Sequence, residues 1–378
     1  MINRENFGIY IHVPFCRRKC LYCDFYSIGE RLADWDLFLR ALKREFEAAE
    51  LPGGGPCTLY IGGGTPSLAP PEFIAGIREM VKCEVGEFTI EVNPDDVTPV
   101  KSALWREAGV NRVSMGVQSL VDKELTFIGR RHSAEEAMEA YSILRRDFGN
   151  VSLDLMFGLP GQTIETLEST LEGFIGMKPE HISAYSLMYE ERTALTRLRD
   201  SGKIREVAEE DTVGMFGLVS ERLHEAGYER YEISNYSRPG FRSRHNSAYW
   251  KGLPYIGLGP GAHSYDGDRT RRRNAPDLSL YLRSWGGTVK SEEIVNVFIE
   301  RLTQEELREE YVMTRLRMAE GIGLEDYKSR FGEEELRRIL INAAPYEGAG
   351  MLAGRESGHL ALTDSGVMVS DEVIVGLF

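Results

Sequence analysis

Three cysteines near the start of the sequence carry its strongest chemical signal. Cys16, Cys20 and Cys23 are spaced C-x3-C-x2-C and follow a strand-like run at 8–13. Thiolates select zinc, Cu(I) and iron–sulfur clusters, so three of them on one loop can converge on a single soft-metal centre. A structural zinc site needs a fourth protein ligand, and the two remaining cysteines do not form a second C-x2-C pair. The spacing therefore favours a [4Fe–4S] cluster with one open iron over a zinc knuckle or three unligated thiols.

The composition is that of a folded protein in a reducing compartment. The 378 residues are 42% hydrophobic and 28% charged, which suits roughly two domains. No apolar run is long enough to span a membrane, and the start MINRENFG lacks the apolar core of a secretion signal, so we expect a cytoplasmic protein that is not a membrane protein. Five cysteines, three of them clustered, fit metal binding better than a disulfide scaffold. A net charge of −14 argues against broad nucleic-acid binding, because such binding needs a basic face.

Six short runs rich in β-branched residues alternate with helical periodicity, which is the pattern of parallel βα units. The strand candidates lie at 8–13, 58–61, 88–92, 112–116, 152–157 and 181–185. A further helix is expected at 208–226 and a further strand at 228–233. This pattern predicts an α/β fold. In such folds the reactive groups lie beyond the carboxyl ends of the strands, which gives a test for the residues found there.

Glycines and polar residues do follow these predicted strands. The second strand leads into a GGGTP segment at 62–66, whose glycines permit positive φ and let backbone N–H groups approach a charged ligand. Four more side chains belong to the next three strands: Glu91 stands at the end of the third strand, Gln118 and Arg130 follow the fourth, and Asp154 lies in the fifth. Carboxylates can accept hydrogen bonds from hydroxyl or ammonium groups, and an arginine can pair with a carboxylate in a bidentate manner. Each residue taken alone is equally compatible with a capping or barrel-rim role.

The order of these motifs, with Tyr22 before the last clustered cysteine, resembles that of the radical S-adenosylmethionine (SAM) superfamily. Over nearly its whole length the sequence resembles the HemN-like family within it, which contains the oxygen-independent coproporphyrinogen III dehydrogenase HemN and the HemW proteins. The resemblance implies a partial (β/α)6 radical SAM barrel, a [4Fe–4S] cluster on Cys16, Cys20 and Cys23, and SAM on the open iron. It places these residues around SAM: Tyr10, Tyr22, Gly63, Gly64, Thr65, Glu91, Gln118, Arg130 and Asp154.

A second candidate site lies in the sequence HNSAYW at 245–250. A histidine beside tyrosine and tryptophan offers an imidazole to a haem iron and flat apolar surface to the macrocycle. This HNxxYW motif resembles the one associated with haem binding in the HemW family, which implies a haem contact for His245; the alternative is a hydrogen-bonded histidine in an aromatic-rich segment. For His263, in GPGAHS, the sequence favours a ligand contact less than for His245. The basic run RTRRR at 269–273 is expected to be a solvated loop, with an anion or propionate contact as the alternative.

The last part of the chain is rich in helix-forming residues. Thr303 and Glu306 predict a capping box for a helix that runs to Met318. Two more helices, at 324–331 and 333–343, precede a strand-like run and a short tail helix, which predicts a winged-helix-like domain. Its many glutamates favour packing or partner docking over nucleic-acid binding. We expect three parts: a radical SAM core at 1–235, a linking segment with both histidine motifs at 236–300, and a smaller, mostly helical domain at 301–378.

Two departures from the HemN pattern bear on the activity. HemN has a fourth cysteine two residues after the third, where this sequence has Phe25, and it has a longer arm before the first cysteine. Both departures favour the HemW type. This type implies a haem chaperone that binds the cluster, SAM and haem and passes haem to acceptor haemoproteins, which include membrane-bound ones. A homodimer is one option for its assembly. The alternatives are radical decarboxylation of coproporphyrinogen III and HemN-like radical SAM methyl transfer. The sequence assigns no catalytic residue and leaves open whether the protein is an enzyme.

Overall fold

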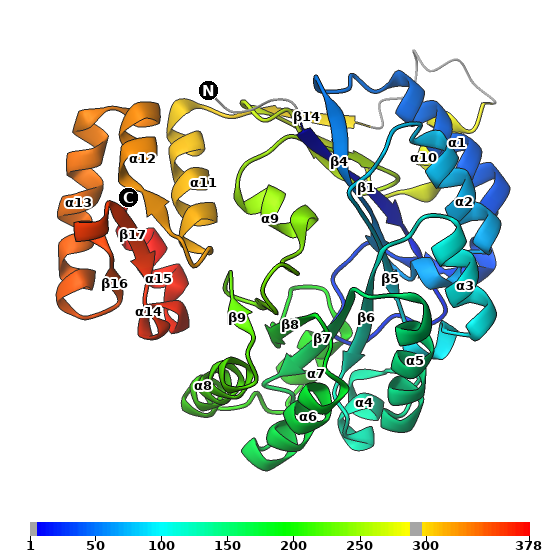
Figure 1. Cartoon of the computed structure of the whole chain (residues 1–378), viewed down its shortest axis with the longest axis horizontal. Helices are drawn as coiled ribbons and strands as arrows, with labels where there is room; N and C mark the ends of the chain where they lie inside the picture. Colours follow the sequence, from blue (N-terminus) through cyan, green and yellow to red (C-terminus); the bar gives the residue numbers. More distant parts are fainter. Residues whose placement is uncertain (1–5, 288–296) are drawn as a thin grey trace.

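Six parallel strands form the centre of the fold (Figure 1). In order across the sheet they are β1 (Asn6–Val13), β4 (Gly55–Gly63), β5 (Glu87–Val92), β6 (Arg112–Gln118), β7 (Val151–Phe157) and β8 (His181–Ser186). The computed structural model describes residues 6–287 and 297–378. Each of the six predicted strands lies within an observed one, and helices alternate with them along the chain, so the prediction of an α/β fold is confirmed.

The two faces of these strands differ because successive side chains of a strand point to opposite sides. On the outer face, apolar side chains such as Ile9, Leu59 and Val113 are fully buried. The helices that cover this face are α1 (Trp35–Ala48), α2 (Pro71–Met80), α3 (Pro99–Glu107), α5 (Ala134–Asp147) and α6 (Ile164–Met177) (Figure 1). The inner face carries polar and aromatic groups such as Tyr10 and Glu91 and lines the hollow side of the curved sheet. The strands therefore form a partial barrel whose inside is available for a site.

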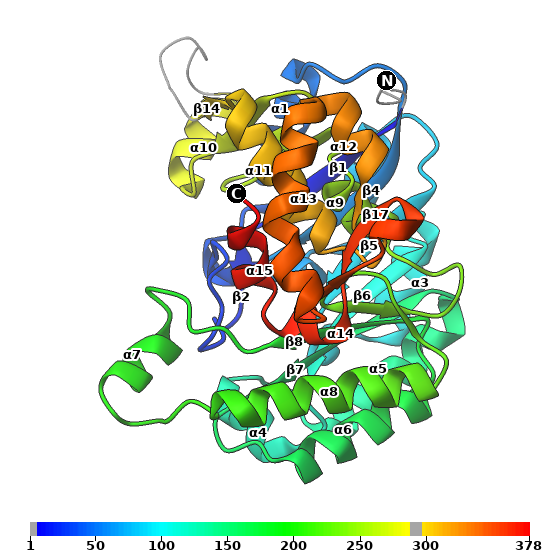
Figure 2. The same ribbon diagram turned by 90° about the vertical axis from the view of Figure 1, so that its left-hand side faces the viewer.

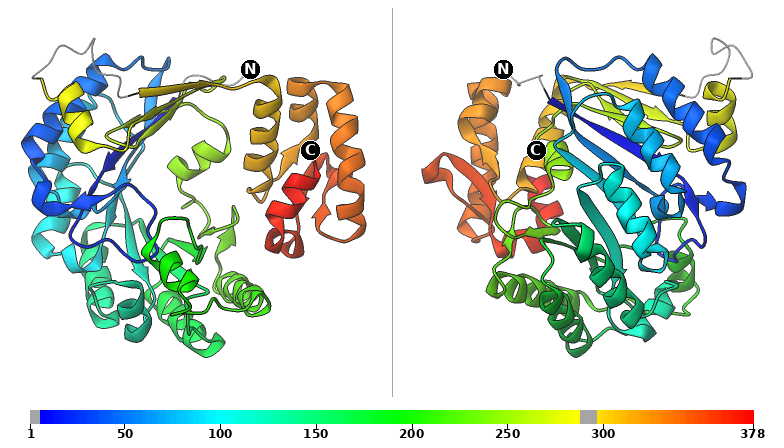
Figure 3. Two further views of the ribbon diagram at one scale, coloured as in Figure 1. Left: turned by 180° about the vertical axis from the view of Figure 1, so that it is seen from behind. Right: turned by 45° about the vertical axis from the view of Figure 1, so that its right-hand side comes forward.

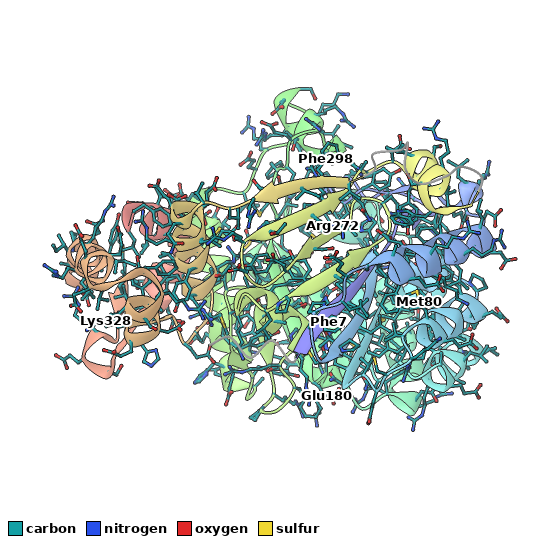
Figure 4. All side chains as sticks on the ribbon, turned by 90° about the horizontal axis from the view of Figure 1, so that it is seen from above. Phe7, Met80, Glu180, Arg272, Phe298 and Lys328 are labelled. Carbon is teal, nitrogen blue, oxygen red and sulfur yellow. The ribbon has the colours of Figure 1, made fainter. Side chains whose placement is uncertain are left out.

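Short strands extend the sheet at both edges, to twelve strands in the described residues. Beyond β1 lie β11 (Tyr255–Leu258), β12 (His263–Tyr265), β13 (Thr270–Asn274) and β14 (Val297–Arg301), and beyond β8 lie β10 (Asn235–Ser237) and β9 (Glu229–Arg230). Strand β11 runs parallel to β1, whereas the other added strands run antiparallel to their neighbours. Figure 4 shows the first extension, from Phe7 on β1 to Arg272 on β13 and Phe298 on β14.

Two expectations about this region are wrong. The basic run at 269–273 is not a solvated loop, because its residues form most of β13 and pair with both β12 and β14. The strand expected at 228–233 is interrupted, because the Glu232 carboxylate accepts hydrogen bonds from Ser234 N, at 3.2 Å, and from the Asn235 side chain, which stabilises a turn between β9 and β10. The domain boundaries expected at 235 and 300 stay predictions, although the segment between them adds β11 to β14 to the sheet of the barrel.

A buried carboxylate on α1 holds these added strands against the barrel. Glu45 accepts hydrogen bonds from Gly259 N at 2.9 Å, from the Asn274 side-chain amide at 2.6 Å and from the Tyr281 hydroxyl at 2.6 Å. These donors lie after β11, on β13 and on α10 (Leu278–Trp285), 214 to 236 residues further along the chain. Burial raises the pKa of Glu45, and the three donors offset part of the cost of burying its charge.

The C-terminal residues form a smaller domain with its own apolar core, opposite the inner face of the barrel (Figures 2 and 3). Its elements are α11 (Gln304–Leu316), β15 (Ile322–Gly323), α12 (Leu324–Phe331), α13 (Glu333–Gly348), β16 (Leu352–Ala353), β17 (His359–Leu362), α14 (Asp364–Met368) and α15 (Ser370–Gly376). The predicted capping box of Thr303 and Glu306 begins α11, and the prediction of a mostly helical domain is confirmed. Arg271 of β13 pairs with Glu310 of α11 at 2.8 Å, which ties this domain to the barrel.

In the described parts of the chain, no helix has the length and apolar character needed to cross a lipid bilayer.

Replacing Glu45 by alanine is expected to lower the free energy of unfolding by about 2–4 kcal/mol, because three buried donors lose their acceptor. Urea titration followed by tryptophan fluorescence measures this change in the barrel, since the four tryptophans lie between residues 35 and 285. Glu47→Ala is the matched control, because Glu47 is exposed on the same helix, and its loss is expected to change the free energy by less than about 0.5 kcal/mol. Equal unfolding midpoints for the two variants would contradict the role given to Glu45.

Candidate functional site

The three clustered cysteines lie on one loop that follows β1, and we call residues 16–27 the cluster loop. The chain leaves β1 through β2 (Phe15–Cys16), carries Cys20 and Cys23 across the loop and returns in β3 (Ile28–Gly29). Cys16 is buried, and the other two cysteines are half-buried. In the middle of the loop, Leu21 N donates to Ile128 O at 3.1 Å. This backbone bond fixes the loop to the carboxyl-end side of the barrel.

The environment of the thiols suits ligands of an iron–sulfur cluster. Burial, together with the charge of neighbouring thiolates, raises the pKa of Cys16 and raises that of Cys23 to about 11. The three sulfurs therefore lie within electrostatic reach of one another. Donors face two of them: Thr65 Oγ1 lies 3.4 Å from Cys16 Sγ, and Arg130 Nη1 lies 3.7 Å from Cys20 Sγ. Such donors favour the thiolate form that metal binding requires.

The donor set of the cluster loop fits an iron–sulfur cluster. Thiolates bind soft metals, and a structural zinc site would need a fourth protein ligand. In a [4Fe–4S] cluster each thiolate binds a different iron, so three thiolates leave one iron open.

The GGGTP segment lies directly against the cluster loop. Gly64 N donates to Val13 O at 2.7 Å, where the chain leaves β1. Gly63 has φ +107°, and a Cβ at this position would lie 2.6 Å from the ring of His12. Only glycine satisfies both the backbone conformation and this close approach. The segment thereby places the end of β4 beside the cysteines, on the predicted SAM side.

Two carboxylates face the inside of the barrel from β5 and β7. Glu91 accepts hydrogen bonds from the Tyr60 hydroxyl at 2.7 Å and from Gly63 N at 3.0 Å, and Asp154 accepts one from the Ser114 hydroxyl at 3.3 Å. Burial is the main cause that raises the pKa of Glu91 to about 7 and that of Asp154 to about 6. A ligand that donates ammonium or hydroxyl hydrogen bonds would stabilise their charged forms.

Gln118 ends β6, and Arg130 follows the next helix, α4 (Asp122–Ile128). Gln118 is buried with φ +74°, a left-handed conformation that costs on the order of 1–3 kcal/mol outside glycine and is typical of functional sites. The Arg130 guanidinium donates to Asn93 Oδ1 at 2.7 Å and to a main-chain carbonyl of β6. Burial alone would lower the pKa of Arg130, but Tyr22 and Cys20 raise it, so the cation is retained next to the cluster loop.

Tyr10 and Tyr22 complete the set of predicted SAM residues. The Tyr10 hydroxyl shares a hydrogen bond with His12 Nδ1 at 3.0 Å, and Tyr22 packs with Leu21 against a small apolar cluster that includes Leu159. Burial raises the pKa of both phenols. The predicted residues thus come from β1, β4, β5, β6 and β7 and from the loops that follow them, and two of them, Thr65 and Arg130, contact cysteines of the cluster loop. Their contact with SAM, and that of the cysteines with a cluster, stay predictions.

A cavity of about 900 Å³ connects this region with the C-terminal domain. It begins at Asp24, Phe25 and Tyr26 of the cluster loop, passes Tyr10 and Glu91, and reaches α11 and α12. Aromatic rings and cations form much of its wall. The aromatic residues include Tyr249, Trp250, Tyr255, Tyr265, Tyr311 and Phe331, and the cations are Lys251, Arg269, Arg271, Arg315 and Arg330. A flat anionic ligand would find both apolar faces and charge partners here.

Helix α9 (Arg244–Trp250) carries the HNxxYW motif into the barrel (Figure 1). The Glu87 carboxylate holds its first turn by accepting hydrogen bonds from Arg244 N at 2.9 Å and His245 N at 3.0 Å, a favourable position for a negative charge. His245 Nδ1 lies 2.8 Å from Thr58 Oγ1, and its Nε2 lies 2.9 Å from the Tyr249 hydroxyl. Burial lowers the pKa of His245 to about 3, so the ring is neutral. His245 lines the cavity with both ring nitrogens bonded, and its haem contact stays a prediction.

Two residues of the inner face, His12 and Tyr60, were not among the predicted site residues, yet they line the cavity beside Tyr10. Period-two alternation could have found His12, because it follows Tyr10 by two positions on one strand. Tyr60 precedes the GGGTP segment by two positions and could have been found in the same way. Arg271, which reaches the cavity from β13, lies in the basic run at 269–273, for which an anion or propionate contact was the predicted alternative.

Comparison with known proteins shows which families and which fold this chain resembles. Residues 10–173 match the family model described as Radical SAM superfamily, and residues 302–369 match that of the HemN C-terminal domain. The chain is 34% identical over 332 residues to the Heme chaperone HemW of Bacillus subtilis (strain 168), covering 85% of this chain and 86% of that protein. It is 34% identical over 382 residues to the Heme chaperone HemW of Mycobacterium tuberculosis (strain ATCC 25618 / H37Rv), covering 98% and 94%. The solved structure of coproporphyrinogen III oxidase (HemN) from Escherichia coli, a radical SAM enzyme, has the same fold, with a TM-score of 0.82 and 21% identity over 99% of this chain and 90% of that chain.

Gly63→Ala is expected to lower the free energy of unfolding by about 2–4 kcal/mol, because the added Cβ would meet the His12 ring at 2.6 Å and the residue would keep a positive φ. Thermal unfolding followed by circular dichroism measures the change. Gly53→Ala is the control, since Gly53 is exposed and its Cβ would meet nothing within 4 Å; its effect is expected to stay below about 0.5 kcal/mol. The same Tm for both variants would show that the close packing of Gly63 does not support the fold.

Proposed function

The chain belongs to the HemW family of radical SAM proteins, and from this premise we propose that it is a haem chaperone that binds a [4Fe–4S] cluster, SAM and haem and passes haem to acceptor haemoproteins. One observation carries the proposal: a cavity of about 900 Å³ joins residues 24–26 of the cluster loop and two predicted SAM residues, Tyr10 and Glu91, to aromatic and basic walls. Cavities of this size bury most of the surface of an organic ligand. Haem matches these walls because it combines a flat macrocycle with two propionates.

The three cysteines of the cluster loop would hold the cluster, leaving one iron for the amino and carboxylate groups of SAM. When bound, the cluster supplies a single electron. The chain's own residues bind and orient SAM: Glu91 and Asp154 accept hydrogen bonds from its ribose hydroxyls or amino group, and Arg130 pairs with its carboxylate. The remaining members of the proposed SAM site are Tyr10, Tyr22, Gly63, Gly64, Thr65 and Gln118. No residue is assigned a catalytic role.

The second part of the proposal places haem between the barrel and the C-terminal domain. Its macrocycle would lie against the tyrosines and Trp250 of the cavity, with His245 in the same wall. The ion pair of Arg271 and Glu310 joins the two domains with side chains 31% and 27% exposed. A partly exposed pair of this kind contributes roughly 1 kcal/mol or less. Main-chain hydrogen bonds from Ile233 N to Arg317 O, at 3.0 Å, and from Ala319 N to Tyr231 O, at 3.1 Å, also hold the two domains together. Acceptors at the membrane, a cytoplasmic location and assembly as a homodimer are parts of the proposal that rest on the family resemblance.

Oxidative decarboxylation of coproporphyrinogen III is the second candidate function, because the chain shares the fold of HemN over 99% of its length. Phe25 argues against it, since the HemN pattern has a fourth cysteine at this position. Radical methyl transfer is a third candidate and would yield S-adenosylhomocysteine.

The proposal is tested with the full chain after anaerobic reconstitution with iron and sulfide. Haem is titrated into the sample while SAM cleavage is assayed, and the haem-loaded protein is then mixed with apomyoglobin as a model acceptor. We expect a saturable Soret band and transfer to the acceptor, with no protoporphyrinogen from added coproporphyrinogen III. Protoporphyrinogen or S-adenosylhomocysteine among the products would support the other candidates instead. Cys16→Ser is expected to abolish the broad charge-transfer absorption of the cluster, whereas the exposed control Cys83→Ser keeps it.

SAM affinity is expected to fall about tenfold as the pH decreases from 8 to 6. Burial raises the pKa of Glu91 to about 7, so this carboxylate is mostly charged at pH 8 and mostly protonated at pH 6, whereas SAM binding uses it as an acceptor. Isothermal titration calorimetry at each pH measures the Kd. Glu91→Gln is expected to bind SAM more weakly at pH 8 and to lose most of this pH dependence. A Kd that stays constant over this range for the unaltered protein would contradict the role proposed for Glu91.

A further inference from the structure

Three histidines line the cavity, and they differ in what their ring nitrogens bond. His12 Nδ1 lies 3.0 Å from the Tyr10 hydroxyl, and its Nε2 lies 2.8 Å from Tyr26 O. Both nitrogens of His245 are bonded as well, each to a hydroxyl group. The ring of His263 makes no hydrogen bond with any of the residues that the structure describes. Its lone pair is therefore available to a ligand without loss of an internal bond.

His263 projects into the cavity from β12 beside two cations. It shares a face of the strand with Tyr265, because residues two apart point the same way. The partners of these two residues on β13 are Arg273 and Arg271. His263 is exposed, and partial burial together with these arginines lowers its pKa, so the ring is neutral at pH 7. Neutral imidazole is the form that binds a metal ion.

Arg271 supplies an anion-binding group on the same face. Its Nη2 donates to Glu310 Oε2 at 2.8 Å, and its guanidinium carbon lies 5.4 Å from the centre of the Tyr265 ring. Its Nε is buried and has no hydrogen-bond partner among the described residues. A buried donor without a partner destabilises the fold, and an anionic group in the cavity would supply the missing acceptor. The pair β12 and β13 thus offers a metal donor and an anion donor side by side.

We propose that His263 supplies the axial imidazole to the haem iron and that Arg271 binds a haem propionate; this inference rests on the proposed function. A nitrogen lone pair of the neutral ring forms a coordinate bond to iron and displaces a solvent ligand. The oxidation state of the iron does not change, and no proton is released.

His245 has a different role in this arrangement. Its ring stacks on that of Tyr60, with the centroids 4.8 Å apart and the planes at 23°. The Tyr60 hydroxyl donates to Glu91 of the predicted SAM site. Since the two nitrogens of His245 are bonded to Thr58 and Tyr249, the residue positions Tyr60 and closes the cavity wall without binding iron.

The test compares haem titrations of the unaltered full chain with those of His263→Ala, His245→Ala and His224→Ala, each followed in the Soret region. His224 is exposed on α8 (Glu209–Glu225) outside the cavity and serves as the control. We expect His263→Ala to shift the Soret band and to weaken haem binding at least about tenfold, as loss of a metal ligand or its support does. Added imidazole is expected to restore the band position in His263→Ala, a readout that a purely structural role would not produce. His224→Ala is expected to keep the band position and the affinity of the unaltered protein, whereas His245→Ala is expected to weaken haem binding without a band shift that imidazole reverses.

The outcomes separate the two levels of the proposal. If the unaltered protein binds haem and His263→Ala gives the same band and affinity, His263 is not the ligand. The inference then fails, whereas the proposed function stands. A band shift in His245→Ala that imidazole reverses would assign the ligand to His245 and would also overturn the inference. If the unaltered protein does not bind haem at all, the proposed function itself fails.

A second measurement tests Arg271 with haem and haem dimethyl ester, which lacks the propionate charges. The unaltered chain is expected to prefer haem about tenfold, and Arg271→Gln to lose most of this preference, because the charge-assisted pair is removed. Arg272→Gln is the matched control, since Arg272 is the next residue of β13 and points to the opposite face (Figure 4). Equal preference in the unaltered protein and in Arg271→Gln would exclude Arg271 as the propionate partner.

Discussion

The alternation of side chains along the six parallel strands is the constraint on which the rest of the structure depends. On the outer face Ile9, Leu59 and Val113 are fully buried under helices, and each such side chain contributes about 1.5–3 kcal/mol. This packing fixes the register, because a shift by one residue would turn the inner polar groups into the helix layer. The inner face can therefore carry Glu91 and Asp154 at a cost in stability that their raised pKa values reflect.

Fixed register brings the candidate site together from separate strands. Parallel neighbours end at the same edge, so the GGGTP segment after β4 meets the cluster loop after β1, and Gly64 N bonds Val13 O at 2.7 Å. The same geometry sets Glu91 of β5 within 3.0 Å of Gly63 N. Arg130 then links the next strand to Cys20. A change in the backbone at any of these strand ends is transmitted to the cluster loop through direct bonds.

The second half of the chain turns this open barrel into a cavity. Helix α9 enters it with its first turn held by Glu87, and β12 and β13 extend the inner wall with His263 and Arg271. The C-terminal domain covers the opening through polar contacts, which include the pair of Arg271 with Glu310 and main-chain bonds between residues 231–233 and 317–319. The barrel and its cover have separate apolar cores, so each can fold around its own buried side chains.

The sequence by itself determined the features that depend on near neighbours in the chain. The cluster loop could be predicted because its three cysteines lie within eight residues, the six strands because alternation and β-branching are local, and the α11 capping box because Thr303 and Glu306 are three apart. Only the tertiary structure decided which groups face the cavity. The hydrogen bonds that hold these groups in place join residues far apart in the chain: the bond between Thr58 and His245 spans 187 positions, and that between Glu45 and Gly259 spans 214. Local pattern carries no information about such pairs, since their partners are chosen by the register of the sheet and the packing of distant segments. For that reason the sequence pointed to His245, whereas the fold left the ring nitrogens of His263 open to a ligand.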